Sequence, residues 1–265
     1  MDRYAPKFIK TIQTIIAGGY DVDYISDAFI KTTRCTDRQL VTSGGTRYKA
    51  LIVPAVRLMP AATLRKLTEL ARQGATIIFV EQYPEDVPGY HELNKNRKIF
   101  QHIVRQLPAT DSFKHTQQFE FGKGLIIAGS DYQQALAQTG IPAEELKTQY
   151  GLQFIRRSNS EGHHYFVSCL QDKDIDGWVT LNVPETAAMF FNPMNGERGK
   201  AQSQTNNGKL QVRLQLKSGE SLIIQTLNKP LDKEPAWNYP KEQAYSLSLD
   251  HGWKLNFVES TPSIT

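Results

Sequence analysis

The part of the sequence that most constrains the fold is an apolar run, a helical pattern and a second apolar run in direct succession. The segments YKALIVPAV (residues 48–56) and ATIIFVE (75–81) are almost continuously apolar. Strands with such runs are buried on both faces, which is typical of a parallel sheet. Between them three leucines recur at helical spacing, and Gly74 stands where a helix usually ends. This order predicts a right-handed strand–helix–strand unit.

The flanking sequence extends this unit in both directions. Apolar periodicity predicts three helices, at residues 5–17, 92–106 and 131–140, and two further strands, at 20–26 and 122–129. We therefore expect residues 1–147 to form a flavodoxin-like α/β domain built on an open parallel sheet.

The character of the sequence changes near residue 150. Short apolar segments alternate there with polar turns: LQFIRRSNS, HHYFVSCLQ, GWVTLNV, AAMFFNP, KLQVRLQLKSG and ESLIIQTL. Short strands at regular spacing predict an antiparallel β-sandwich domain over residues 150–228. Residues 229–265 are interpreted as a proline-containing linker and the start of a further β module, because two strand-like runs are too few to bury a core.

Composition and charge argue against several classes of protein. The 265 residues are 40% hydrophobic and 22% charged, with a net charge of +4. Basic residues are scattered among nearly as many acids, whereas nucleic-acid binders cluster them, so we expect no nucleic-acid partner. No run reaches the ~18 apolar residues of a membrane span, so we expect no membrane partner. The N-terminal stretch lacks the apolar segment of a signal peptide, so the sequence as written predicts a cytoplasmic chain.

Motifs for cofactors, metals and nucleophilic catalysis are missing from the sequence. It has no GxGxxG, no phosphate-binding GxxxxGK[ST] and no GxSxG, so we expect no cofactor. Cys35 and Cys169 form no CxxC, and we interpret both as free thiols. Cys35 also lacks the flanking glycines of a glutamine amidotransferase nucleophile. His163 and His164 would point to opposite faces of a strand, so we expect no metal site there.

Two groups of carboxylates are the candidates for chemistry in the α/β region. Glu81, Glu85 and Asp86 follow a parallel strand, at the sheet edge where open α/β folds bind ligands, so they are the predicted substrate-binding residues. A solvated loop is the alternative. Asp21 and Asp23 would share one face of a strand, the arrangement that paired acids of a glycosidase need. The interpretation of a polar strand end is favoured for them.

Aromatic residues of the β region have two interpretations. Tyr165, Trp178, Phe190 and Phe191 lie in alternating strands. Buried aromatics contribute large apolar areas to a core, and we favour that role. A platform on which a sugar ring stacks is the alternative.

Several of these segments, taken in order, resemble one family. The segments are GGYDVDYISDAFI, YKALIVPAVRLMPAATLRKLTELARQGATIIF, GKGLIIAG, GLQFIRRSNSEGHHYFVSC, FFNPMNGERG and VRLQLKSGESLIIQ. The sequence resembles the C-terminal half of glycoside hydrolase family 106, the α-L-rhamnosidases, over residues 5–228. It departs from the family at Asn192–Gly196, where a DP-x-TG turn is usual, and at Ser168–Cys169, where Asn is usual.

The resemblance implies a function and a partner. Family members carry a (β/α)₈ catalytic barrel before the α/β domain, with both catalytic glutamates in it, so no catalytic residue transfers to this sequence. We therefore expect an accessory part of an α-L-rhamnosidase-like enzyme of polysaccharide breakdown, inactive alone, with the barrel as partner and a periplasmic or secreted parent enzyme. A free-standing carbohydrate-binding or scaffold module is the alternative. A small-molecule enzyme using the sheet edge around Glu81 is a third reading.

Overall fold

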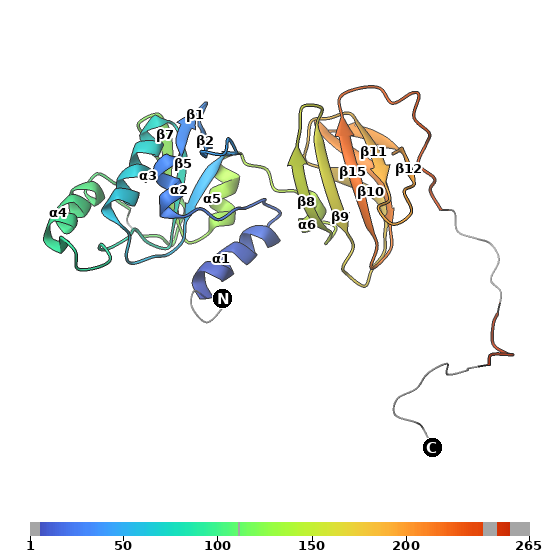
Figure 1. Cartoon of the computed structure of the whole chain (residues 1–265), viewed down its shortest axis with the longest axis horizontal. Helices are drawn as coiled ribbons and strands as arrows, with labels where there is room; N and C mark the ends of the chain where they lie inside the picture. The colour runs from blue at the N-terminus through green and yellow to red at the C-terminus, as the bar shows by residue number, and fades with distance from the viewer. Residues whose placement is uncertain (1–5, 111, 241–247, 255–265) are drawn as a thin grey trace, which may run out of the picture.

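The computed structural model describes residues 6–110, 112–240 and 248–254. Its elements fall into two groups along the long axis of the molecule (Figure 1). The first group mixes helices and strands, and the second is almost entirely strands. The predicted change of character near residue 150 is therefore visible in the structure.

The first group is built around a four-stranded sheet in the order β4-β5-β7-β6. Strands β4, β5 and β7 are parallel, and β6 pairs antiparallel with β7. A small antiparallel sheet, β1-β2-β3, lies beside it. The elements are α1 (Pro6–Ala17), α2 (Asp27–Thr32), β1 (Arg34–Thr36), β2 (Gln39–Val41), β3 (Arg47–Tyr48), β4 (Ala50–Val53), α3 (Ala61–Gln73), β5 (Thr76–Val80), α4 (Leu93–Val104), β6 (Gln117–Phe121), β7 (Gly124–Gly129) and α5 (Tyr132–Gln138).

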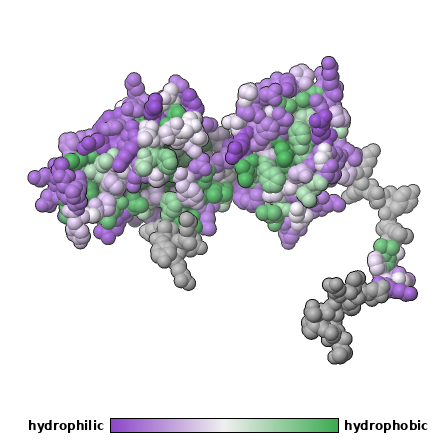
Figure 2. Space-filling view, viewed as in Figure 1, coloured by the Kyte–Doolittle hydropathy of each residue, from purple (hydrophilic) through white to green (hydrophobic). Residues whose placement is uncertain are grey.

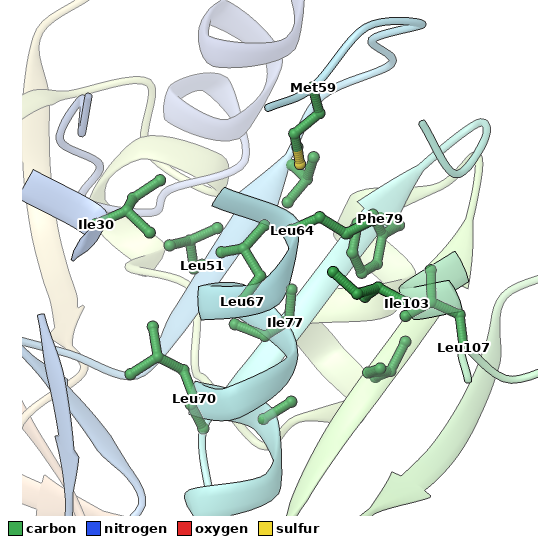
Figure 3. Close-up of a cluster of buried hydrophobic side chains, with 14 of the residues drawn as sticks. Ile30, Leu51, Met59, Leu64, Leu67, Leu70, Ile77, Phe79, Ile103 and Leu107 are labelled. Atoms are coloured by element: carbon green, nitrogen blue, oxygen red, sulfur yellow. The ribbon is translucent and has the colours of Figure 1, made fainter. Parts of the chain in front are cut away.

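Helices cover both faces of this sheet. Alternate residues of β5 face opposite ways: Ile77 and Phe79 join the cluster that holds α3 and α4, and Ile78 and Val80 join the cluster that holds α1 and α5. Figure 3 shows the first cluster, in which the leucines of α3 lie against Ile77 and Phe79. Burial of each of these leucine side chains contributes about 2 kcal/mol to the free energy of folding through the apolar area removed from water.

Two glycines allow the strand after α3 and the hairpin at β7 to pass close together. Gly74 ends α3 with φ +128°, a conformation that favours glycine. A Cβ at Gly124 would lie 2.4 Å from the carbonyl oxygen of Ala71. Any residue larger than glycine at position 124, the start of β7, would therefore push α3 away from the sheet.

The second group consists of two antiparallel sheets. One has the order β12-β11-β15-β9-β8, and the other has the order β10-β14-β13. Both sheets contribute residues to one buried cluster, which includes Tyr165, Phe190, Val179 and Leu214. The elements are α6 (Glu145–Thr148), β8 (Gln153–Ser158), β9 (His163–Ser168), β10 (Ile175–Leu181), β11 (Ala187–Phe191), β12 (Arg198–Lys200), β13 (Ser203–Asn206), β14 (Lys209–Leu216) and β15 (Ser221–Leu227).

Several predicted elements differ from the structure. Residues 20–26 form no strand. They run as an irregular segment from α1 to α2. The predicted all-parallel sheet is wrong at its edge, where the unpredicted β6 is antiparallel. Residues 248–254 form neither helix nor strand, and the rest of the strand-like runs near the C-terminus lies outside the described residues. No helix in the described part of the chain is long and apolar enough to cross a membrane.

Candidate functional site

The loops after β4 and β5 meet at the carboxyl edge of the parallel sheet, where the sequence predicts Glu81, Glu85 and Asp86 to lie. The backbone N–H groups of Glu85 and Asp86 donate to the carbonyl of Arg57, at 2.8 and 3.2 Å. The N–H of Met59 returns a bond to the carbonyl of Asp86 at 2.9 Å. The loop that holds the predicted substrate-binding residues is therefore fixed to its neighbour rather than open.

Asp86 is bound to an arginine of α4. The guanidinium of Arg97 donates from Nε to both carboxylate oxygens at 2.9 Å and from Nη2 to Oδ2 at 2.5 Å. The N–H of Val87 donates to Oδ1 at 2.8 Å. These hydrogen bonds lower the pKa of Asp86 below its ordinary value, and the bonds from Arg97 have the largest effect. Asp86 therefore attaches the loop to α4 and has little capacity left for a ligand.

Glu85 and Glu81 are the more accessible residues of the predicted trio. Glu85 pairs with Arg57 at 3.0 Å, with both side chains more than half exposed. It also lines a hollow of about 170 Å³ against α4. Glu81 is exposed and has φ +64°, which costs a non-glycine residue about 1 kcal/mol. Of the three, Glu85 and Glu81 remain candidates for ligand contact at this edge.

Asp21 and Asp23 do not form a pair of opposed acids. Asp23 accepts a hydrogen bond from the hydroxyl of Tyr48 at 2.5 Å, which raises the pKa of Tyr48 to about 12. Asp21 accepts from Arg156 of β8, at 2.7 Å from Nη2. Each carboxylate therefore has a separate structural partner in place of the glycosidase arrangement. The favoured interpretation as a polar strand end is wrong about the strand, because residues 20–26 form neither helix nor strand.

A polar cluster that the sequence did not reveal lies between the two groups of elements, and two of its residues, Glu144 and Tyr165, are fully buried. We call it the junction cluster: Asp21, Glu144, Arg156, Tyr165 and Asn182. Glu144 is fully buried, and its Oε2 accepts from Arg156 Nη1 and from the Tyr165 hydroxyl, both at 3.0 Å. Its Oε1 accepts from the N–H of Asn182 at 3.1 Å. Every oxygen of this carboxylate has a donor, as a buried charge requires.

Burial dominates the electrostatics of the junction cluster. Loss of water raises the pKa of Glu144 above its ordinary value, although the charge of Arg156 and the donated hydrogen bonds oppose the shift. Burial also raises the pKa of Tyr165 far above its ordinary range. Gly19 completes the junction: its carbonyl accepts from the N–H of Glu144 at 2.8 Å, and a Cβ there would lie 2.6 Å from the Glu144 carbonyl oxygen.

The histidine pair and the cysteines carry no shared site. His163 hydrogen bonds with Glu185 at 3.0 Å, whereas His164 hydrogen bonds with Asn159 at 2.8 Å. Cys35 and Cys169 are free thiols, as expected. Within the described residues, no three metal-ligating side chains of His, Cys, Asp or Glu lie close enough to hold an ion.

A second hollow lies between α3 and α4. Its volume is about 400 Å³, and its lining includes the basic residues Arg65, Arg72 and Lys98 beside Glu69. Arg72 donates to Gln106 at 2.5 Å and lies 4.8 Å from the ring centre of Phe121. The hollow is lined by the C-terminal parts of the two helices and by Gln106 just after α4, so it is separate from the loops at the carboxyl edge.

Comparison with known proteins places this chain in a family of glycoside hydrolases. The family model described as α-L-rhamnosidase, glycoside hydrolase family 106, matches residues 2–205. The chain belongs to this α-L-rhamnosidase family.

A solved structure supports the same fold. The chain is similar to a rhamnosidase from Novosphingobium sp. PP1Y, with a TM-score of 0.66 and 19% sequence identity over 84% of this chain. The matched region spans only 21% of that rhamnosidase chain. A search of curated proteins found no match.

Proposed function

We propose that this chain is an accessory part of an α-L-rhamnosidase-like glycoside hydrolase of polysaccharide breakdown, and that it does not hydrolyse glycosides by itself. In this proposal residues 1–147 are a flavodoxin-like domain, residues 150–228 are a β-sandwich, and residues 229–265 lead towards a further β module. The partner is a (β/α)₈ catalytic barrel, either as another domain or as another polypeptide.

The observation that carries the proposal is an apolar row on the outer face of the larger sheet. Ile155 of β8 lies opposite Phe166 of β9, Phe166 lies opposite Ile223 of β15, and Ile223 lies opposite Phe191 of β11. Ile155 is 65% exposed and Phe166 is 43% exposed. Figure 2 shows hydrophobic surface over β8 and β9 among hydrophilic side chains. We call these four residues the apolar row.

An apolar row of this kind is typical of a surface that another protein part covers. Polar residues border it on both sides, with Ser168 in one neighbouring row and His164 in the other. A polar border around an apolar centre resembles the anatomy of a protein interface. The similar rhamnosidase chain contains much more protein than the matched region, which is consistent with a large neighbour in such enzymes.

Three carboxylates, those of Asp21, Glu144 and Asp86, support the lack of independent catalysis. Glycoside hydrolysis needs two carboxyl groups on opposite sides of the scissile bond, about 5–9 Å apart, with room for the sugar. Asp21 and Glu144 both bind Arg156, which therefore occupies the space between them. Asp86 is bound to Arg97. These acids are committed to arginines, so they suit a structural role better than proton transfer.

The first test is hydrolysis of p-nitrophenyl α-L-rhamnopyranoside by the purified chain. We expect no release of nitrophenol above the uncatalysed rate. Enzymatic turnover that follows the protein through purification, and that persists with a protein expressed in a different host, would overturn the accessory role.

The second test concerns the apolar row. We expect the purified chain to self-associate weakly through this surface, because its apolar side chains are exposed, and Phe166→Glu to abolish that association in sedimentation velocity. Leu170→Glu is the matched control, since Leu170 is 73% exposed but lies outside the row. Equal association of all three proteins would show that the row is not an interface.

The alternative function, a free-standing carbohydrate-binding module, is favoured by one observation. Tyr165 and Phe190 are fully buried, but Trp178 is 40% exposed. Interpretation of all four aromatics as core residues is therefore wrong for Trp178, and also for Phe191, which belongs to the apolar row and packs against a separate small cluster.

A further inference from the structure

We infer that the outer face of the β10-β14-β13 sheet binds a neutral polysaccharide segment, with Trp178 as the stacking platform. This inference takes its ligand class from the proposed function, but it concerns a different surface from the apolar row. It rests on the direction of the Trp178 side chain, the amide groups around it and the charge balance of the face.

Trp178 points away from the core. Its neighbour Val179 is fully buried, as is Leu181, and successive residues of a strand point to opposite faces. Asp176, Trp178 and Thr180 therefore share the outer face of β10. An indole that is 40% exposed leaves a large apolar ring surface in water. The buried cluster between the two sheets does not include Trp178.

Amide side chains lie beside the indole in fixed positions. Trp178 is directly opposite Arg213, and the next outward pair is Thr180 with Gln211. Gln211 lies in turn opposite Gln204 of β13. Gln204 donates to Gln211 at 2.9 Å, and Gln211 donates to the hydroxyl of Thr180 at 3.1 Å. These two hydrogen bonds orient two amides and one hydroxyl in a row across all three strands before any ligand binds.

Such a surface matches the chemistry of a sugar. One side of a pyranose ring presents C–H groups, which are apolar and can lie flat on an aromatic ring, while the hydroxyl groups at its edge both donate and accept. Amide side chains supply a donor and an acceptor from one group, as the hydroxyls require. Binding sites of this type combine an apolar or aromatic surface with a few placed polar groups.

The charge balance of the face favours a neutral ligand. Arg213 forms an ion pair with Asp176, and Gln215 donates to the same carboxylate at 3.1 Å. At the other end of the face Lys209 pairs with Glu145 at 2.7 Å. Because each of these basic groups is paired with an acid, the face lacks the excess positive charge that binding of nucleic acid or another polyanion requires.

The test is affinity electrophoresis of the complete chain in native gels that contain α-L-rhamnan, xylan or dextran. We expect at least one of these polysaccharides to retard the wild-type chain. Trp178→Ala should weaken the apparent affinity about tenfold or more, since loss of 1.4 kcal/mol corresponds to a factor of ten. Trp178→Phe should restore part of the retardation, because it restores an aromatic ring.

Trp253→Ala is the matched control, because Trp253 is 76% exposed and lies outside both sheets of the second group. It should be retarded like the wild type. Gels without polysaccharide and circular dichroism report whether Trp178→Ala is folded. If no polysaccharide retards the wild type, or if Trp178→Ala is retarded equally, the inference is wrong. Hydrolysis of the aryl rhamnoside by the pure chain would overturn the accessory role alone and would leave the gel result standing.

Discussion

Two carboxylate–arginine pairs of this protein have the same chemistry and opposite electrostatics. Asp86 pairs with Arg97 at the sheet edge, with side chains that are 31% and 43% exposed. Glu144 pairs with Arg156 in the junction cluster, with side chains that are 0% and 21% exposed. The pKa of Asp86 is lowered by the bonds from Arg97, whereas the pKa of Glu144 is raised by burial.

The difference shows that access of water, more than the identity of the partner, determines the direction in which the pKa of a paired carboxylate shifts. At the sheet edge the arginine adds an attraction to a carboxylate that solvent still reaches, so the charged form is favoured. At the junction, removal of solvent from Glu144 outweighs the attraction of Arg156. A buried pair of this kind is weak support for stability, but removal of one partner is costly because the other remains buried and charged.

The largest expected effect is therefore at Glu144. Glu144→Ala leaves Arg156 with only Asp21 and removes the acceptor for Tyr165 and Asn182. We expect the free energy of unfolding to fall by about 3 kcal/mol, the usual cost of breaking a buried pair. Urea denaturation followed by circular dichroism measures this change.

Glu144→Gln is the matched variant for this prediction. Glutamine buries no carboxylate charge and keeps one oxygen acceptor, but its NH2 group replaces the other oxygen, so only part of the donors around Glu144 stay satisfied. We expect it to lose less stability than Glu144→Ala. Equal losses for the two variants would mean that the charge, not the hydrogen bonds, holds the junction.

The next effect in size is at Tyr165. Its hydroxyl donates to Glu144 at 3.0 Å, and its ring is fully buried in the cluster shared by the two antiparallel sheets. Tyr165→Phe keeps the ring and removes the donor, so we expect a loss of about 1–2 kcal/mol in the free energy of unfolding. Tyr90→Phe is the control for removal of a hydroxyl, because Tyr90 is 93% exposed. No loss for Tyr165→Phe would show that Arg156 and Asn182 satisfy Glu144 by themselves.

The two carboxylates should also respond to pH with opposite signs. The raised pKa of Glu144 means that its contribution to stability is full below the ordinary value of 4.5 and is lost as pH rises through the raised pKa. The lowered pKa of Asp86 means that its contribution is present above 3.8 and is lost as pH falls through the lowered pKa. With rising pH, the stability of wild type relative to Glu144→Gln should fall, whereas that relative to Asp86→Asn should rise.

Urea titrations of the wild type, Glu144→Gln and Asp86→Asn between about pH 3 and pH 7 test this prediction, since the two shifts act on either side of the ordinary carboxyl range. The quantity to follow is the difference in unfolding free energy between each variant and the wild type. Differences that change in the same direction with pH would contradict the opposite effects of burial at the two sites.

Local sequence patterns were enough for the centre of the α/β region. The leucines of α3, the glycine at its end and the apolar runs of β4 and β5 all agree with one structure, because β5 is buried on both faces and β4 is buried on one face and half-buried on the other. The position of Asp86 at the sheet edge was also predictable from its place after β5. Its partner was not, since Arg97 lies eleven residues further on and reaches back from α4.

The junction cluster could not be predicted in the same way. Glu144 and Glu145 are adjacent and chemically identical, yet Glu144 is fully buried and Glu145 pairs with Lys209. Glu144 is buried because β8, β9 and the segment at Gly19, which lie elsewhere in the sequence, pack around it, and no local pattern distinguishes it from Glu145. Trp178 was misjudged for a related reason: a strand with a period of two has two possible phases, and a shift of one residue exchanges its faces.

The smallest expected effect is at Asp21, the solvent-facing end of the junction cluster. Its carboxylate accepts from Arg156 at 2.7 Å but is 47% exposed, so water competes with the ion pair. Asp21→Asn should lower the free energy of unfolding by about 0.5 kcal/mol, as is usual for exposed pairs, and the loss should shrink further in 1 M NaCl. In the background of Glu144→Ala the same substitution should cost more, because Asp21 is then the remaining partner of Arg156. Additive losses in that double-mutant cycle would mean that the two carboxylates bind Arg156 independently. In that case the buried carboxylate of Glu144 and the exposed carboxylate of Asp21 would have no interaction free energy with each other.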